Sequence, residues 1–263
     1  MADAAVHNHI LRRLDQTARE EGVRILYAAE SGSRAWGFAS PDSDYDVRFI
    51  YAHPEDWYLR LVPGRDVIER PLDPELVDLA GWDVRKTLQL MLKSNPALYE
   101  WLCSPIVYVD DGKFQPALKS LYERHASPRT LGLHYASIAG ATAARHLDRR
   151  DEVNLKRYFY VLRPILSLQW IVENGGTPPM HMDALLAGSN VPANVADAIT
   201  RLIALKQETP ELGSGPRLPI IDSWIEERQK TLAAAASKLS VKDQSSTASE
   251  AERLFRMTIR REL

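Results

Sequence analysis

Two aspartates that could hold a metal ion, Asp44 and Asp46, stand one residue apart in the sequence. They lie at the start of residues 45–51, a stretch rich in aromatic and β-branched side chains that is predicted to form a β-strand. Side chains alternate between the two faces of a strand, so both carboxylates share one face and the apolar side chains share the other. Two close carboxylates repel each other unless a cation lies between them, and Mg²⁺ prefers such oxygen ligands. The pair therefore predicts a divalent-metal site, with a solvated acidic turn as the alternative, because a Pro-Asp-Ser turn sequence precedes the strand.

A glycine and a serine that could hold phosphate, Gly32 and Ser33, follow a second predicted strand at residues 24–29. Glycine lets the backbone approach a ligand closely. Ser33 can begin a short helix, whose free N–H groups and positive dipole end attract phosphate. Arg34 either contacts phosphate or lies in solvent. A serine at this position alone would indicate only a helix cap, but beside the aspartate pair the segment predicts a nucleotide site next to a metal site.

The order of these motifs resembles the DNA polymerase β-type nucleotidyltransferase superfamily. The resemblance rests on Gly-Ser-Arg-Ala-x-Gly beginning at Gly32, followed by Pro-Asp-Ser-Asp-Tyr-Asp at residues 41–46. Stretches further along the chain are similar to the RNA-ligase-associated, polymerase-β-like branch; they lie at residues 78–86, 93–96, 100–105 and 155–164. The resemblance spans residues 23–190. It implies transfer of a nucleoside monophosphate from an NTP to an acceptor hydroxyl, with release of pyrophosphate and with Mg²⁺, or Mn²⁺, as the cofactor.

The resemblance also implies a third carboxylate on a neighbouring strand, and two residues compete for that role. Asp78 lies in the alternating stretch 75–80, where its apolar neighbours face away from it. Asp83 precedes a predicted helix and is also a typical helix N-cap. We favour Asp78 as the third metal ligand and as the group that helps deprotonate the acceptor, and Asp83 remains the alternative.

A second group of polar residues lies on a helix predicted at residues 154–173. Lys156, Tyr160 and Arg163 recur at helical spacing and form a stripe separate from the apolar one. Two cations and a phenol suit a triphosphate and a stacked base, so these residues are predicted to bind nucleotide, with a solvated basic face as the alternative. Pro164 inside the helix costs about 3 kcal/mol or more, a cost more tolerable near a functional site than elsewhere.

Composition limits the class of protein. Of 263 residues, 45% are hydrophobic and 26% are charged, as in ordinary globular proteins. The net charge of −2 creates no overall basic field, so contact with RNA would need a local patch. The single cysteine, Cys103, excludes an internal disulfide. It fits a reducing cytosol, and with no long apolar run or signal-peptide core a cytoplasmic protein without a membrane partner is expected.

The order of predicted elements indicates an α+β fold. Strands are predicted in the first half, at residues 24–30, 45–52, 66–72 and 75–81, with an additional strand at residues 105–109. After Phe114 the strand signals disappear, and helical segments separated by Gly and Pro follow. We therefore expect a polymerase-β-type catalytic domain at residues 1–112, with a mixed sheet and helices, and an all-α domain at residues 113–263. The helical domain is expected to complete the nucleotide cleft, with the polar stripe facing Ser33 and Asp46.

Three functions agree with this pattern. The first is nucleotidyl transfer to RNA ends, as in RNA repair. The second keeps the chemistry but transfers to a protein side chain or a small molecule. The third is a non-catalytic nucleotide-binding protein, against which the intact Asp-x-Asp and Gly-Ser motifs argue. The net acidity weakens the RNA alternative, and no motif selects the base of the NTP.

Overall fold

The computed structural model describes residues 4–147, 152–209, 213–242 and 245–263. The chain forms two compact units. The first comprises Met1–Arg34, Asp44–His125 and Asp243–Leu263, and the second comprises Ala35–Ser43 and Ala126–Lys242. Each unit therefore draws on more than one segment of the chain, where the sequence analysis expected a single division after residue 112.

A five-stranded sheet forms the centre of the first unit, with the order β3-β4-β2-β1-β5. Its strands are β1 Arg24–Glu30, β2 Tyr45–Ala52, β3 Val67–Arg70, β4 Val77–Asp83 and β5 Val107–Asp110. Strands β2 and β4 run parallel and the other neighbours run antiparallel, so the sheet is mixed. The predicted α+β class is confirmed, and the five expected strands all form, including β5 at the predicted additional strand.

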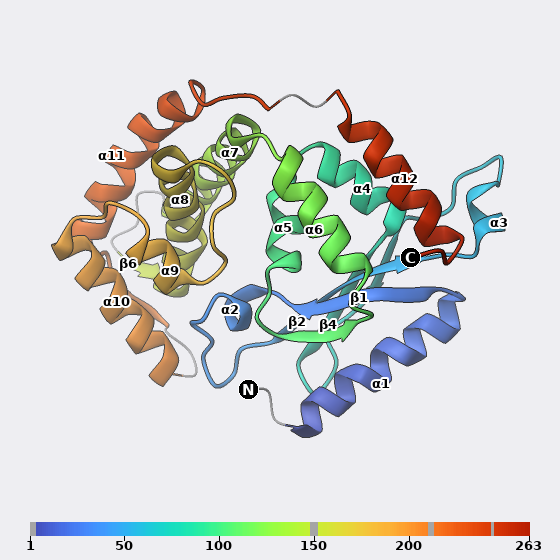
Figure 1. The fold of residues 1–263 in the computed structure, drawn as a ribbon. Helices are drawn as coiled ribbons and strands as arrows, with labels where there is room; N and C mark the ends of the chain where they lie inside the picture. The colour runs from blue at the N-terminus through green and yellow to red at the C-terminus, as the bar shows by residue number, and fades with distance from the viewer. Residues whose placement is uncertain (1–3, 148–151, 210–212, 243–244) are drawn as a thin grey trace. The chain divides into compact units, whose positions relative to one another are not determined.

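Apolar side chains of β1, β2 and β4 meet helix α1 (Ala4–Glu21) on one face of the sheet. Val47, Phe49 and Leu79 are buried there with Ile10 and Leu14 of the helix. The other helices of this unit are α2 Gly32–Ala35, α3 Glu55–Tyr58, α4 Val84–Leu92, α5 Pro96–Leu102, α6 Phe114–His125 and α12 Thr247–Ile259. Figure 1 shows α1 on one side of the sheet and α4, α6 and α12 on the other. The alternation predicted for β2 thus leaves the aspartates on the face away from α1.

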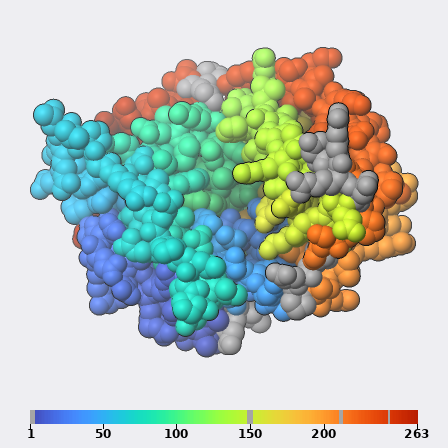
Figure 2. Space-filling view, turned by 180° about the vertical axis from the view of Figure 1, so that it is seen from behind, coloured from blue at the N-terminus to red at the C-terminus, as the bar shows by residue number. Residues whose placement is uncertain are grey.

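The segment after α3 carries exposed apolar side chains. Leu61 is 99% exposed, and Leu59 and Val62 are also exposed. Figure 2 shows this part of the chain, in light blue, projecting from the first unit. None of the helices in the described part of the chain is both long enough and apolar enough to cross a membrane.

The second unit is built around helix α8 (Lys156–Asn174), which packs against α7, α9 and α11. The other helices of this unit are α7 Pro128–His146, α9 Met182–Ala187, α10 Ala193–Glu208 and α11 Pro219–Ala236. The unit is not entirely helical, because β6 (Glu152–Asn154) pairs with β7 (Ser214–Pro216). These two strands were not predicted from the sequence, because three residues that include Gly or Asn show no alternating pattern.

Candidate functional site

Two carboxylates lie side by side on the parallel strands β2 and β4, where Asp46 is paired in register with Asp78. Arg48 follows Asp46 on the same face and binds both side chains. Its guanidinium nitrogens lie 2.8 Å from Asp46 Oδ1 and 2.7 Å from Asp78 Oδ2. The structure therefore brings together two of the predicted metal ligands, with a cationic side chain between them that the sequence analysis did not select.

Asp44 lies just before β2 and is exposed. Its carbonyl oxygen accepts a hydrogen bond from Arg34 Nε at 3.1 Å. The Arg34 guanidinium lies over the Tyr45 ring, 3.7 Å from the centroid. Arg34 thus links the Gly-Ser segment to the aspartate pair. The carboxylates of Asp44, Asp46 and Asp78 do not all lie within 4.8 Å of one another.

Gly32 and Asp46 approach each other closely. A Cβ atom added to Gly32 would lie 2.0 Å from Asp46 Oδ2, and the φ of Gly32 is +59°, which favours glycine. The Ser31 amide donates to the Asp46 carbonyl at 2.8 Å. Helix α2 begins at Gly32, so its first residue lies next to this carboxylate. The two halves of the sequence motif are therefore adjacent in the folded unit.

A buried carboxylate that the sequence analysis missed, Glu30, lies directly before this segment. It is 0% exposed. It accepts the Asp46 amide at 2.7 Å and the Tyr108 hydroxyl. Burial raises the pKa of Glu30 to about 7, although these two hydrogen bonds oppose the rise. Its signal in the sequence is a glutamate that ends an otherwise apolar strand.

Asp83, the alternative third carboxylate, lies at the opposite end of β4 from Asp78. Five residues of strand separate them by roughly 16 Å. Asp83 caps α4 by accepting the Arg85 amide at 2.8 Å, and it also accepts the Tyr58 hydroxyl at 2.7 Å. Burial raises its pKa, against the effect of these hydrogen bonds. The predicted N-cap is thus confirmed, and Asp78, not Asp83, is the register partner of Asp46.

The polar stripe predicted on α8 does not lie on one exposed face. Lys156 and Tyr160 are exposed, but Arg163 is only 5% exposed. Its guanidinium lies over the Trp36 ring, 4.4 Å from the centroid, and donates to the Met180 carbonyl at 3.3 Å. The helix is buried on nearly all sides from its second turn, so helical spacing alone did not separate a polar stripe from the core.

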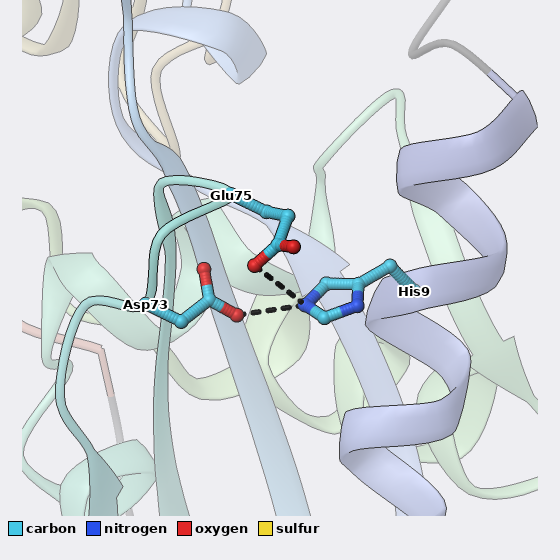
Figure 3. A group of neighbouring side chains, drawn as sticks. All are labelled: His9, Asp73 and Glu75. Atoms are coloured by element: carbon cyan, nitrogen blue, oxygen red, sulfur yellow. Dashed lines mark hydrogen bonds and ion pairs between the residues drawn. The ribbon is translucent and has the colours of Figure 1, made fainter.

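A histidine and two acidic residues outside this site also lie close together (Figure 3). His9 Nε2 lies 2.7 Å from Asp73 Oδ2 and 3.8 Å from Glu75 Oε2. Within the described ranges, this is the one group of three metal-ligating side chains whose ligand atoms all lie within 4.8 Å. Asp73 also binds Arg13 at 2.9 Å and accepts the Val77 amide at 2.9 Å. Both Asp73 oxygens are therefore engaged, and the group holds α1 to the β3–β4 connection.

The mixed sheet, with a Gly-Ser segment against paired aspartates, places the protein among the polymerase-β-like nucleotidyltransferases. The chain belongs to the RNA repair pathway DNA polymerase beta family, whose model matches residues 6–257. It is 41% identical over 249 residues to the uncharacterized protein YcgL of Bacillus subtilis strain 168, covering 95% of this chain and 94% of that protein. A nucleotidyltransferase-like protein from Exiguobacterium sibiricum 255-15 aligns with a TM-score of 0.32 and 13% identity, over 97% of this chain and 80% of that one.

Proposed function

We propose that this protein transfers a nucleoside monophosphate from an NTP to an acceptor hydroxyl and releases pyrophosphate. The observation that carries the proposal is the contact of Gly32 with the Asp46 carboxylate, next to Asp78. It brings the proposed phosphate-binding segment directly against the proposed metal ligands. Membership of a polymerase-β family supports the same chemistry.

The carboxylates fit a divalent cation. Asp46 and Asp78 offer oxygen donors, and both already bind one cationic group, Arg48. Asp44, Asp46 and Asp78 would hold Mg²⁺ or Mn²⁺, which when bound neutralises phosphate charge and activates the attacking oxygen. Asp78 would accept the proton of the acceptor hydroxyl. Arg48 would keep the two carboxylates in place.

Nucleotide-binding groups are proposed on each unit taken by itself. Gly32, Ser33 and Arg34 would bind the departing phosphates through the start of α2. On the helical unit, Lys156 and Tyr160 are exposed and are the proposed nucleotide-binding side chains. Arg163, being buried, would contribute by holding Trp36.

An RNA end is the proposed acceptor, because the description of the family names an RNA repair pathway. A protein side chain and a small molecule are the alternatives. The test incubates the protein and Mg²⁺ with each NTP labelled at the α-phosphate, in the presence of RNA with defined ends or of protein acceptors. We expect label to move to RNA, and an Asp46→Asn variant to lose at least about 100-fold of the rate. Asp15→Asn, on the exposed part of α1, is the matched control. Wild-type turnover by the Asp46 variant would contradict the proposed chemistry. Transfer of the label to protein would instead identify a protein side chain as the acceptor.

A further inference from the structure

Glu30 occupies an unusual place for a carboxylate. In the β1–β2 register Glu30 pairs with Val47. Its side chain therefore lies on the face of the sheet that packs against the apolar side chains of α1. The aspartates of the site lie on the other face. Burying a carboxylate among apolar groups is unfavourable, and an apolar side chain of similar volume often gives equal or greater stability. Stability alone therefore gives no reason for a glutamate at this position.

Both backbone polar groups of Asp46 are held by two consecutive residues at the end of β1. Glu30 Oε1 accepts its amide at 2.7 Å, while the Ser31 amide donates to its carbonyl at 2.8 Å. The next residue is Gly32, whose Cα faces the Asp46 carboxylate. The other oxygen of Glu30 accepts the hydroxyl of Tyr108 from β5. One carboxylate thus connects the ends of three strands beneath the site.

We infer that Glu30 is a positioning residue, which fixes the Asp46 backbone against the Gly-Ser segment by accepting its amide and the Tyr108 hydroxyl. This inference rests on the function proposed above. Glu30 touches no reacting atom, since it acts from the opposite face of the sheet. Its hydrogen bonds would keep the Asp46 carboxylate aimed at the metal and phosphate groups. Groups that orient ligating carboxylates commonly change activity by about 10–100-fold when removed.

Three variants separate positioning from simple packing. Glu30→Gln keeps an oxygen acceptor for the Asp46 amide and removes the charge. Glu30→Met keeps the volume and removes both hydrogen bonds. The exposed Glu226→Gln is the control for loss of a negative charge. Hydrogen exchange of the Asp46 amide, measured on the protein alone by NMR, reports the hydrogen bond without reference to activity.

We expect Glu30→Met to lose Asp46 amide protection and to lower kcat by about tenfold or more, with KM for NTP changed less than about threefold. Glu30→Gln should restore the protection and most of kcat. Wild-type kcat in Glu30→Met, or a Glu30→Gln as slow as Glu30→Met, would overturn the inference. If Glu30→Met does not fold, Tyr108→Phe decides, since a wild-type kcat there would equally overturn it. Retained activity in Asp46→Asn would instead refute the proposed function itself.

Discussion

At the level of single residues, Arg48 accounts for how two carboxylates stand side by side in one sheet. Its guanidinium binds both Asp46 and Asp78, and all three side chains are partly buried. The positive charge between them offsets the mutual repulsion of the two carboxylates. The pair is therefore assembled by the protein itself, and no movement of β2 against β4 is needed to bring the two aspartates together.

The two competing carboxylates of β4 should respond differently to substitution. We expect Asp78→Asn to lower the rate of nucleotidyl transfer by about 100-fold or more, because it removes a charged partner of Asp46. Asp83→Ala should chiefly lower the free energy of unfolding, by about 1–3 kcal/mol, since it removes a helix cap and leaves the Tyr58 hydroxyl without its acceptor. Thermal melts and initial rates on both variants would decide. An active Asp78 variant together with an inactive, stable Asp83 variant would exchange the two roles.

Gly32 and Gly112 provide a matched pair of positions that tests the close approach of Gly32 to Asp46. Both have positive φ, +59° and +73°, so alanine at either costs about 1–2 kcal/mol of strain. A Cβ at Gly32 would meet Asp46, whereas nothing lies within 4 Å of a Cβ at Gly112. We therefore expect Gly32→Ala to lose activity about 100-fold and Gly112→Ala to keep it. Rates and melting temperatures measured together test this. Equal activities would show that the contact with Asp46 has no role in the reaction.

At the level of elements, features that depend on a local sequence pattern could be predicted, and features that depend on contacts between distant segments could not. Strand β2 alternates between half-buried and buried side chains from Asp46 to Phe49, and its sequence therefore indicates which face carries Asp46 and Arg48. The β2–β4 register pairs Asp46 with Asp78, but it joins segments that are distant in the sequence. The sequence alone therefore could not decide between Asp78 and Asp83 as the third carboxylate. Glu30 was missed because its partners, Asp46 and Tyr108, come from two other strands. Helix α8 is buried on nearly all sides, so its spacing could not show that Arg163 is buried while Lys156 and Tyr160 are exposed.

Helix α10 carries a buried cation with a definite pH signature. Lys206 is 2% exposed, and its ammonium lies 4.5 Å from the centroid of the Phe38 ring. Burial, and then the charge of Lys156, lower the pKa of Lys206 to about 8 from the usual 10.5. Between pH 8 and 10.5 the unfolded chain binds the extra proton, so the contribution of this residue to stability rises with pH across that range.

Lys206→Met should therefore stabilise the protein at pH 7, by roughly 1–3 kcal/mol after allowing for the lost cation–π contacts. The gain should shrink as the pH rises through 8 and vanish near pH 10.5. Urea unfolding of both proteins at pH 7 and pH 9.5 measures the difference, and the exposed Lys230→Met is the control. A gain that does not depend on pH would mean that Lys206 is protonated equally in the folded and unfolded chains.

At the scale of the whole molecule, the two units do not follow the order of the chain. The segment Ala35–Ser43, between the Gly-Ser motif and Asp44, belongs to the helical unit. Phe38 stacks on Phe159 with ring centroids 4.6 Å apart, and the Trp36 carbonyl accepts the Met182 amide at 3.0 Å. In the opposite sense, α12 returns to the first unit from the end of the chain. A division based on composition could not predict this, because the sequence of a helix does not show which unit the helix packs against.

Helix α12 should therefore be required for the stability of the sheet-containing unit. It packs against α4 and α6, burying Ala251 and Leu254, and Glu250 binds Arg124 at 2.9 Å. A chain ending at residue 242 exposes this apolar surface and should lose about 3 kcal/mol or more, lowering Tm by roughly 10 °C.

A chain that keeps α12 and ends at Ile259 loses exposed polar contacts and the half-buried Leu263, and should change by less than about 2 kcal/mol. Thermal melts of the three chains, followed by circular dichroism, test this, and an unchanged Tm for the chain ending at residue 242 would show that α12 contributes nothing to the unit it packs on.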